Sequence, residues 1–137
     1  MRIMGIDYGT KRIGIALSDE LQMMAHASDS IDRGAVGNVM EALKGLVRDN
    51  GVGEIVVGLP VSMNGTYSDM TREVMIFVDE LKGSVPVAVN TWDERLTSVM
   101  AERTLLEADM SRQKRRKLSD KLAAKFILQG YLDSKRR

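Results

Sequence analysis

The sequence predicts an α/β domain in which a mixed β-sheet lies between layers of helices. Short apolar runs alternate along the chain with segments whose apolar residues recur at helical spacing. Two of the apolar runs, 54–60 and 85–92, are continuous, which is typical of strands buried on both faces of a sheet. A meander followed by alternating strands and helices indicates a three-layer arrangement with a mixed sheet.

The first half of the chain predicts a meander followed by a helix. Residues 2–7 and 12–18 are strand-like runs joined by a short Tyr-Gly-Thr-Lys connection, which indicates a hairpin-like pair. A third short strand is expected near 24–31. Residues 36–48 carry apolar side chains at helical spacing and end at an Asn-Gly stop signal, which predicts a helix.

The second half predicts two buried strands and three helices. Residues 54–60 and 85–92 are the two strands, and 68–82 form a helix with one apolar stripe. Residues 97–108 also have a helical pattern. After a basic run, a last helix is expected over about 119–132. Its predicted inner face consists of Leu122, Ala123, Phe126, Ile127, Gly130 and Tyr131.

Length and composition narrow the classes of function. A chain of 137 residues fits one domain, 1–137, that can bury about 68% of its unfolded surface. It has no cysteine, which excludes disulfide scaffolds and cysteine-type zinc sites. With a single histidine, any metal would need oxygen ligands, which favours magnesium or manganese. No run resembles a signal peptide or a membrane span, so we expect a cytoplasmic protein without membrane contact.

Charge is unevenly distributed along the chain although the net charge is only +1. Residues 111–137 hold ten Lys or Arg and two acids, whereas residues 1–110 hold ten and seventeen. The net charges of the two parts are therefore +8 and −7. An acidic body with a basic C-terminal arm suggests a polyanionic partner, but a solvated, charged helix end has the same composition.

Three acidic residues fall where sites form in such folds. In open α/β sheets, sites lie beyond the C-terminal ends of the strands. Asp7 ends the first predicted strand, and Glu94 lies two residues beyond Trp92, at the end of a later strand. Asp120 heads the last predicted helix, on the stripe that faces the sheet. We expect the three carboxylates to converge on one edge.

Each of these acids also has a purely structural explanation. Asp7 could bond backbone N–H groups in a turn, and Glu94 could pair with Arg95 in a loop. Asp120 could complement the positive end of its helix, with Ser119 as the cap. Three acids on one edge would repel one another, however, and a cation between them best explains that cost. Carboxylates that bind magnesium suit two-metal phosphodiester hydrolysis.

Basic side chains accompany all three acids. The cations expected to contact nucleic acid are Lys11, Arg12, Arg95, Arg112, Lys114, Arg115, Arg116 and Lys117. Such side chains neutralise phosphates and make binding salt-dependent. A substrate that is both polyanionic and cleaved with metal is a nucleic acid. Because aromatic residues are few, recognition of backbone and shape is favoured over base stacking.

Several segments, taken together, resemble those of one family. They are DYGTKRIGIALSD, GLPVSMNG, DERLTS and SDKLAAKFILQGYLD. In these segments, which cover essentially the whole chain, the protein resembles the YqgF family. Its members have an RNase H-like fold and are described as pre-16S rRNA nucleases or Holliday-junction resolvases.

The resemblance implies the fold and the site. It implies an RNase H-like fold with a mixed five-stranded sheet flanked by helices. It also implies that Asp7, Glu94 and Asp120 are catalytic and bind Mg²⁺ or Mn²⁺. The chain departs from the family at Ser119, where an apolar residue is usual, and at Ser98, where a second threonine is common. Neither change removes a carboxylate.

The sequence is compatible with four functions. The leading one is a metal-dependent nuclease, a hydrolase that processes the 5′ end of pre-16S rRNA during ribosome biogenesis. The second is a Holliday-junction resolvase acting on branched DNA, which should be a homodimer, whereas a ribosomal-precursor nuclease could be a monomer. The third is ATP binding, because the DxGT pattern resembles a phosphate loop of actin-like and sugar-kinase folds. The fourth is a non-catalytic RNA-binding scaffold.

Overall fold

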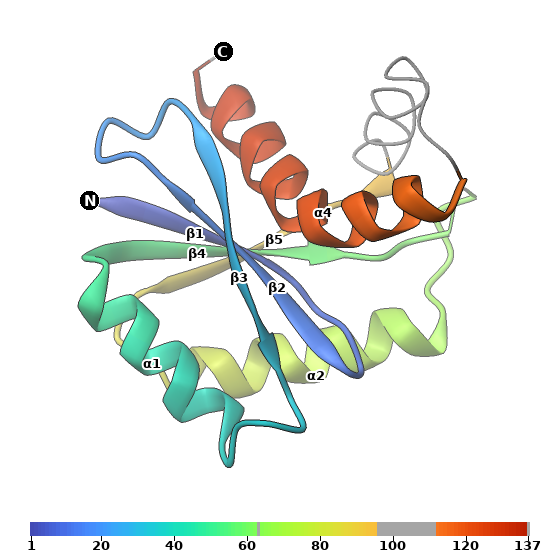
Figure 1. The fold of residues 1–137 in the computed structure, drawn as a ribbon, viewed down its shortest axis with the longest axis horizontal. Coiled ribbons are helices and arrows are strands. Elements are labelled where there is room, and N and C mark those ends of the chain that lie inside the picture. The colour runs from blue at the N-terminus through green and yellow to red at the C-terminus, as the bar shows by residue number, and fades with distance from the viewer. Residues whose placement is uncertain (63, 96–111, 137) are drawn as a thin grey trace.

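The fold is built on a five-stranded mixed sheet of order β3-β2-β1-β4-β5. A computed structural model describes residues 1–62, 64–95 and 112–136, with only the backbone described over 112–121. The strands are β1 (Arg2–Asp7), β2 (Arg12–Ser18), β3 (Ala25–Asp32), β4 (Val52–Leu59) and β5 (Ala88–Asp93). The β1–β2 and β2–β3 pairs are antiparallel, whereas β1–β4 and β4–β5 are parallel (Figure 1). The predicted meander and mixed sheet are confirmed.

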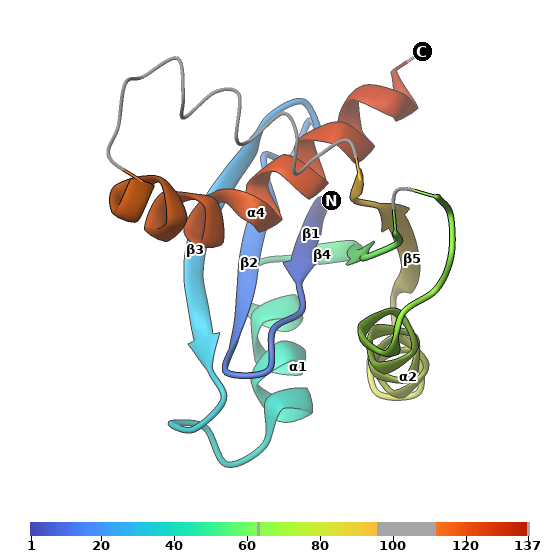
Figure 2. The same ribbon diagram turned by 90° about the vertical axis from the view of Figure 1, so that its right-hand side faces the viewer.

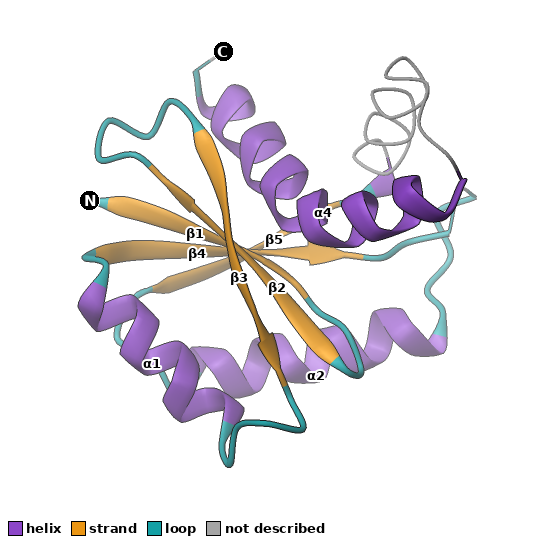
Figure 3. Cartoon of the chain, viewed as in Figure 1, coloured by secondary structure: helices purple, strands orange, loops and turns teal. Residues whose placement is uncertain are grey.

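Helices cover both faces of this sheet. Helices α1 (Val39–Asp49) and α2 (Asp69–Lys82) pack on one face, and α4 (Arg112–Lys135) crosses the other (Figures 2 and 3). The larger core lies between the sheet and α1 and α2, and a smaller one lies under α4. Three layers therefore form, as the alternation of strands and helices predicted.

Local sequence signals define the ends of α1 and α2. The side chain of Asn38 caps α1 by accepting a hydrogen bond from the Glu41 N–H. Ser68 and Thr71 form a capping box at the start of α2. These signals explain why both helices begin within three residues of the predicted positions.

The last helix differs from the prediction. It begins at Arg112 and includes the basic run that we expected to precede it. Lys, Arg and Gln are good helix formers, so a dense positive charge does not end a helix. Asp120 therefore lies inside α4, and the prediction that it heads the helix is wrong. The structural alternative, in which Ser119 caps the helix, is excluded for the same reason. The predicted helix over 97–108 lies outside the described residues.

The inner face of α4 is also rotated from the predicted one. Among the side chains of α4 that are described, the fully buried ones are Ala124, Ile127, Leu128 and Leu132. Ile127 was predicted correctly, whereas Leu122 and Phe126 are only partly buried. A stripe offset by one residue is a shift of about 100° around a helix, so a pattern of mixed small and large residues leaves this choice open.

Helix α4 approaches the sheet closely because β1 has a glycine, Gly5, at the contact. A Cβ built on Gly5 would lie 2.7 Å from the Leu128 Cβ and 3.0 Å from the Ala124 carbonyl oxygen. Both of these partners belong to the buried face of α4. Any side chain at position 5 would therefore push the helix away from β1.

The structure shows no membrane-spanning helix within the described ranges, since none of these helices is both long and apolar enough.

We expect Gly5→Ala to destabilise the protein by about 1–3 kcal/mol, because the added methyl group overpacks the contact with α4. Urea denaturation at constant pH measures this change. Gly45→Ala is the matched control, because Gly45 lies inside α1, where an added Cβ makes only an ordinary contact with the Arg48 side chain. It should stabilise the protein by about 0.5–1 kcal/mol. A Gly5→Ala protein as stable as the wild type would contradict the close packing.

Candidate active site

Asp7 and Glu94 emerge at the same edge of the sheet. Asp7 is the last residue of β1, and Glu94 follows directly after the last residue of β5. The Glu94 N–H donates to the Leu59 carbonyl oxygen at 3.3 Å, which continues the pairing of β4 with β5. Because β1, β4 and β5 are parallel neighbours, their C-terminal ends bring both acids together across β4, as predicted.

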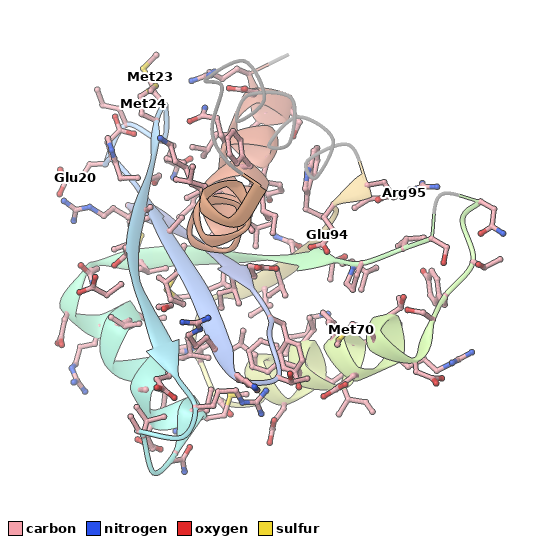
Figure 4. All side chains as sticks on the ribbon, turned by 45° about the vertical axis from the view of Figure 1, so that its right-hand side comes forward. Glu20, Met23, Met24, Met70, Glu94 and Arg95 are labelled. Carbon is pink, nitrogen blue, oxygen red and sulfur yellow. The ribbon has the colours of Figure 1, made fainter. Side chains whose placement is uncertain are left out.

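Both acids also lie on the face of the sheet that α4 covers. Asp7 pairs with Gly14 across β1 and β2, and a Cβ on Gly14 would lie 3.4 Å from the Asp7 Cβ and 3.6 Å from the Ala124 Cβ. The Asp7 side chain therefore points toward α4. Figure 4 shows Glu94 directed toward the sheet below α4.

Gly58 of β4 makes room for the Glu94 carboxylate. A Cβ on Gly58 would lie 2.5 Å from Glu94 Oε2 and would collide with the end of the Ile127 side chain. Glu94 and Ile127 therefore share the space that a side chain at position 58 would occupy. The sequence shows a glycine here, but only the structure shows that the side chains of Glu94 and Ile127 fill the space beside it.

The electrostatic environment of Glu94 is unfavourable for a carboxylate. Burial raises its pKa to about 7, and the negative charges of Asp7 and then Asp93 contribute to the same shift. Desolvation and nearby like charges both disfavour the ionised form. The contribution from Asp7 agrees with the position of both acids at the same edge of the sheet.

The third predicted acid, Asp120, is placed only by its backbone. It precedes Ala124 by one turn of α4, and Ala124 is the residue that lies near Gly14 and Asp7. Its side chain lies outside the described residues. Among the side chains that are described, no three His, Cys, Asp or Glu form a group suited to a metal ion.

The predicted cations differ in what the structure assigns to them. Lys11 and Arg12 are exposed beside the turn that follows Asp7. Arg95 is directed outward, and its guanidinium forms an ion pair of 2.6 Å with Asp93 (Figure 4). The other five belong to α4, and their side chains lie outside the described residues: Arg112, Lys114, Arg115, Arg116 and Lys117.

Sequence reasoning missed the part that Asp93 plays. Its carboxylate accepts hydrogen bonds from the Arg95 N–H at 3.0 Å and from Arg95 Nε at 2.8 Å. The bonds from Arg95 outweigh partial burial and lower the Asp93 pKa. Asp93 thus fixes the backbone on both sides of Glu94. Asp side chains often accept from the backbone N–H two residues further on, and this local signal could have indicated the role.

The turn after Asp7 is held by residues from distant segments. Tyr8 donates a hydrogen bond of 2.8 Å to Glu73 Oε1 of α2. Arg33 lies over the Tyr8 ring at 5.1 Å and donates to the Gly9 carbonyl oxygen at 3.0 Å. No local pattern in the sequence indicates these contacts, because they join the first turn to α2 and to the residue that follows β3.

We expect Glu94→Gln to stabilise the protein in EDTA at pH 8 by about 1–2 kcal/mol, a range reduced for partial exposure of the side chain. The pKa of Glu94 in the folded protein, about 7, exceeds its ordinary value of 4.5. The folded state therefore binds more protons between these pH values, and the free energy of unfolding falls as pH rises through this window.

The variant cannot ionise, so its advantage should shrink toward pH 5. Urea denaturation at both pH values measures the difference, and Glu20→Gln, at an exposed position, is the matched control. An equal gain in the free energy of unfolding at both pH values would show that the pKa of Glu94 is not raised in the folded protein.

Comparison with known proteins identifies the family. A family model described as "RuvX: Holliday junction resolvase" matches residues 1–134. A protein of Moorella thermoacetica named "Putative pre-16S rRNA nuclease" is 51% identical over 133 residues, 97% of this chain and 95% of the relative. A protein of Halothermothrix orenii with the same name is 47% identical over the same shares. Both descriptions denote enzymes that hydrolyse nucleic acid.

Solved structures show the same fold at low sequence identity. The RuvC of T. thermophilus in complex with a Holliday junction substrate matches with a TM-score of 0.54 at 16% identity, over 99% of this chain and 96% of that one. The fowlpox virus Holliday junction resolvase matches with a TM-score of 0.55 at 16% identity, over 98% and 99%. These likenesses confirm the RNase H-like fold, and the matches along the whole sequence show that the chain belongs to the RuvX (YqgF) family.

Proposed function

We propose that this protein is a divalent-metal-dependent nuclease that hydrolyses phosphodiester bonds in structured nucleic acid, with the 5′ end of pre-16S rRNA as its leading substrate. The observation that carries the proposal is the convergence of Asp7 and Glu94 at one edge of the sheet, where burial and then the charge of Asp7 raise the pKa of Glu94. The names of the curated relatives support the choice of substrate.

The residues at this edge fit a divalent metal. Asp7 and Glu94 offer carboxylate oxygens, the donors that Mg²⁺ and Mn²⁺ prefer. Their mutual repulsion is the cost that a cation removes. We propose Asp120 as the third member of the metal-binding and catalytic set, because the helical spacing from Ala124 supports it. When bound, Mg²⁺ or Mn²⁺ would supply an activated water and would stabilise the leaving oxygen.

The surrounding residues have distinct parts in this proposal. Ile127 and the backbone at Gly58 shield one side of the Glu94 carboxylate from water. Lys11 and Arg12 bind phosphates next to Asp7, and Arg95 together with the basic first turns of α4 extends this surface. The tight turn after Asp7, held through Tyr8, keeps the cations in place relative to the acids.

Branched DNA is the alternative substrate, supported by the description of the family. A four-way junction has approximate two-fold symmetry, so a resolvase should act as a dimer with two sites. A stable dimer that cleaves four-way junctions in preference to pre-16S rRNA favours this alternative. A monomer that trims the ribosomal precursor favours the leading one.

We expect Asp7→Asn to lower Mg²⁺-dependent cleavage by more than about a hundredfold, since changes to groups that only support metal ligands can cost that much. Binding of the nucleic acid should persist, which separates an enzyme from a scaffold. Cleavage in Mg²⁺ and Mn²⁺ is compared with Ca²⁺, and Asp69→Asn, at an exposed acid of α2, is the matched control. Wild-type cleavage by purified Asp7→Asn protein would overturn the assignment.

We expect Lys11→Ala to reduce the slope of log Kobs against log salt concentration by about one, because each phosphate contact releases about one counterion. Lys44→Ala is the control, because Lys44 lies on α1, across the sheet from the site, and pairs with Glu41. Filter binding at several salt concentrations measures both slopes. Equal slopes for the wild type and Lys11→Ala would exclude a phosphate contact at this position.

A further inference from the structure

A polar cluster joins α4 to the sheet away from the candidate active site. Glu54 of β4 is its centre, with a side chain only 17% exposed. Tyr131 of α4 donates its hydroxyl to Glu54 Oε2, and Asn90 of β5 donates to the same oxygen at 3.0 Å. Lys135 of α4 forms an ion pair with Glu54 Oε1 at 3.1 Å. Three elements therefore meet at one carboxylate.

The hydrogen bonds of this cluster constrain the orientation of α4 on the sheet as well as its distance from the sheet. Burial opposes the ionisation of Glu54, but the bonds from Tyr131, Lys135 and Asn90 outweigh it and lower its pKa. Burial, followed by the bond to Glu54, raises the pKa of Tyr131 to about 12. Hydrogen bonds to an ionised acceptor are strong and have narrow geometry. The apolar contacts of α4 have no such directionality. Among the described side chains, its other directional contacts lie on the β3 side, where Gln129 accepts from the Ala25 N–H and donates to the Met23 carbonyl oxygen.

The same strand face connects the cluster to the candidate active site. Glu54, Val56 and Gly58 are every second residue of β4, so they lie on the same face of the strand, the one that α4 covers. At the Gly58 end, the Ile127 side chain and the Glu94 carboxylate share one space. A tilt of α4 at Glu54 would therefore alter the space that confines Glu94.

A second path runs through β5. Trp92 lies two residues before Glu94, and its ring meets the Tyr131 ring edge-on with centroids 6.0 Å apart. A Cβ built on Gly130 would lie 3.2 Å from the Trp92 indole nitrogen, so α4 packs tightly on this ring. A shift of Tyr131 would therefore displace Trp92 and the end of β5, which Glu94 directly follows.

We propose that Glu54 and Tyr131 are positioning residues for the candidate active site. Their hydrogen bond holds α4 where Ile127 confines the Glu94 carboxylate. It also keeps Tyr131 packed on Trp92, in the strand that leads to Glu94. This inference rests on the proposed function and adds to it two residues that act from outside the carboxylate set. It differs from a purely stabilising role, which would change the fraction of folded protein without changing the turnover of the folded molecules.

The full-length Tyr131→Phe protein tests the inference, because it removes only the hydroxyl group. We expect kcat for Mg²⁺-dependent cleavage to fall about tenfold or more, since small misplacements of reacting groups have effects of this size. KM for the nucleic acid should change less than about twofold, because Lys11 and Arg12 are far from the change in sequence and structure. The Mg²⁺ concentration for half-maximal activity should rise. Wild-type values of kcat and Mg²⁺ dependence would overturn the inference.

Two further variants separate positioning from loss of stability. Leu43→Val opens space in the core under α1, on the opposite face of the sheet, and should lower stability while leaving kcat unchanged. Glu54→Gln keeps an oxygen that can accept from Tyr131, so it should lose less activity than Glu54→Ala. A loss of kcat in Leu43→Val equal to that in Tyr131→Phe would overturn the inference.

Trp92 supplies a readout that does not depend on cleavage, because it is the only tryptophan in the chain. Titration with Mg²⁺ or Ca²⁺ should change its fluorescence in the wild type, and the half-saturation point should rise in Tyr131→Phe. If the wild type neither cleaves nor responds to either ion, the proposed function fails and the inference fails with it. If the wild type does both and Tyr131→Phe matches it, only the inference fails.

Discussion

The close contact between α4 and the sheet is the constraint on which the rest of the structure depends. Gly5 admits Leu128 and the Ala124 carbonyl, so the helix lies closer to β1 than any side chain at position 5 would allow. The same approach places Ile127 over Gly58, where it covers part of the Glu94 carboxylate. Packing and electrostatics at the site are thus two results of a single contact, since the helix that fills the smaller core also removes water from the acid.

Two glutamates near this helix show how the neighbours of a carboxylate decide its chemistry. Glu54 receives hydrogen bonds from a phenol, an amide and an ammonium group, and its pKa is lowered despite burial. Glu94 is buried near the charges of Asp7 and Asp93, and its pKa is raised to about 7. A structural acid is surrounded by donors, whereas an acid held next to another acid costs stability unless a cation joins them. This contrast favours Glu94, and not Glu54, as the functional group.

The sequence was sufficient for those features that depend on chain order and local pattern. The shared location of Asp7 and Glu94 could be predicted, because parallel strands end at the same edge of a sheet. This prediction needs only the order of the strands along the chain. The start of α4 could not be predicted, because a run of Lys and Arg is compatible with both a loop and a helix. The hydrogen bond between Glu54 and Tyr131 joins residues 77 positions apart, so no periodic pattern in the sequence indicates it. Asp120 stays a prediction, since its side chain lies outside the described residues.

Because α4 is one continuous helix, a force applied at its basic end is transmitted to the part that covers Glu94. The segment that carries the basic residues and the segment that covers Glu94 belong to one helix, Arg112–Lys135. A polyanion bound along the first turns would exert a force on the helix, and apolar contacts alone would resist sliding only weakly because they are not directional. The bonds to Glu54 lie at the opposite end from the basic turns, as do those that Gln129 and Arg136 donate to the Met23 carbonyl oxygen. Together these bonds resist both sliding and tilting. Binding of substrate and confinement of Glu94 can therefore use the same helix without disturbing one another.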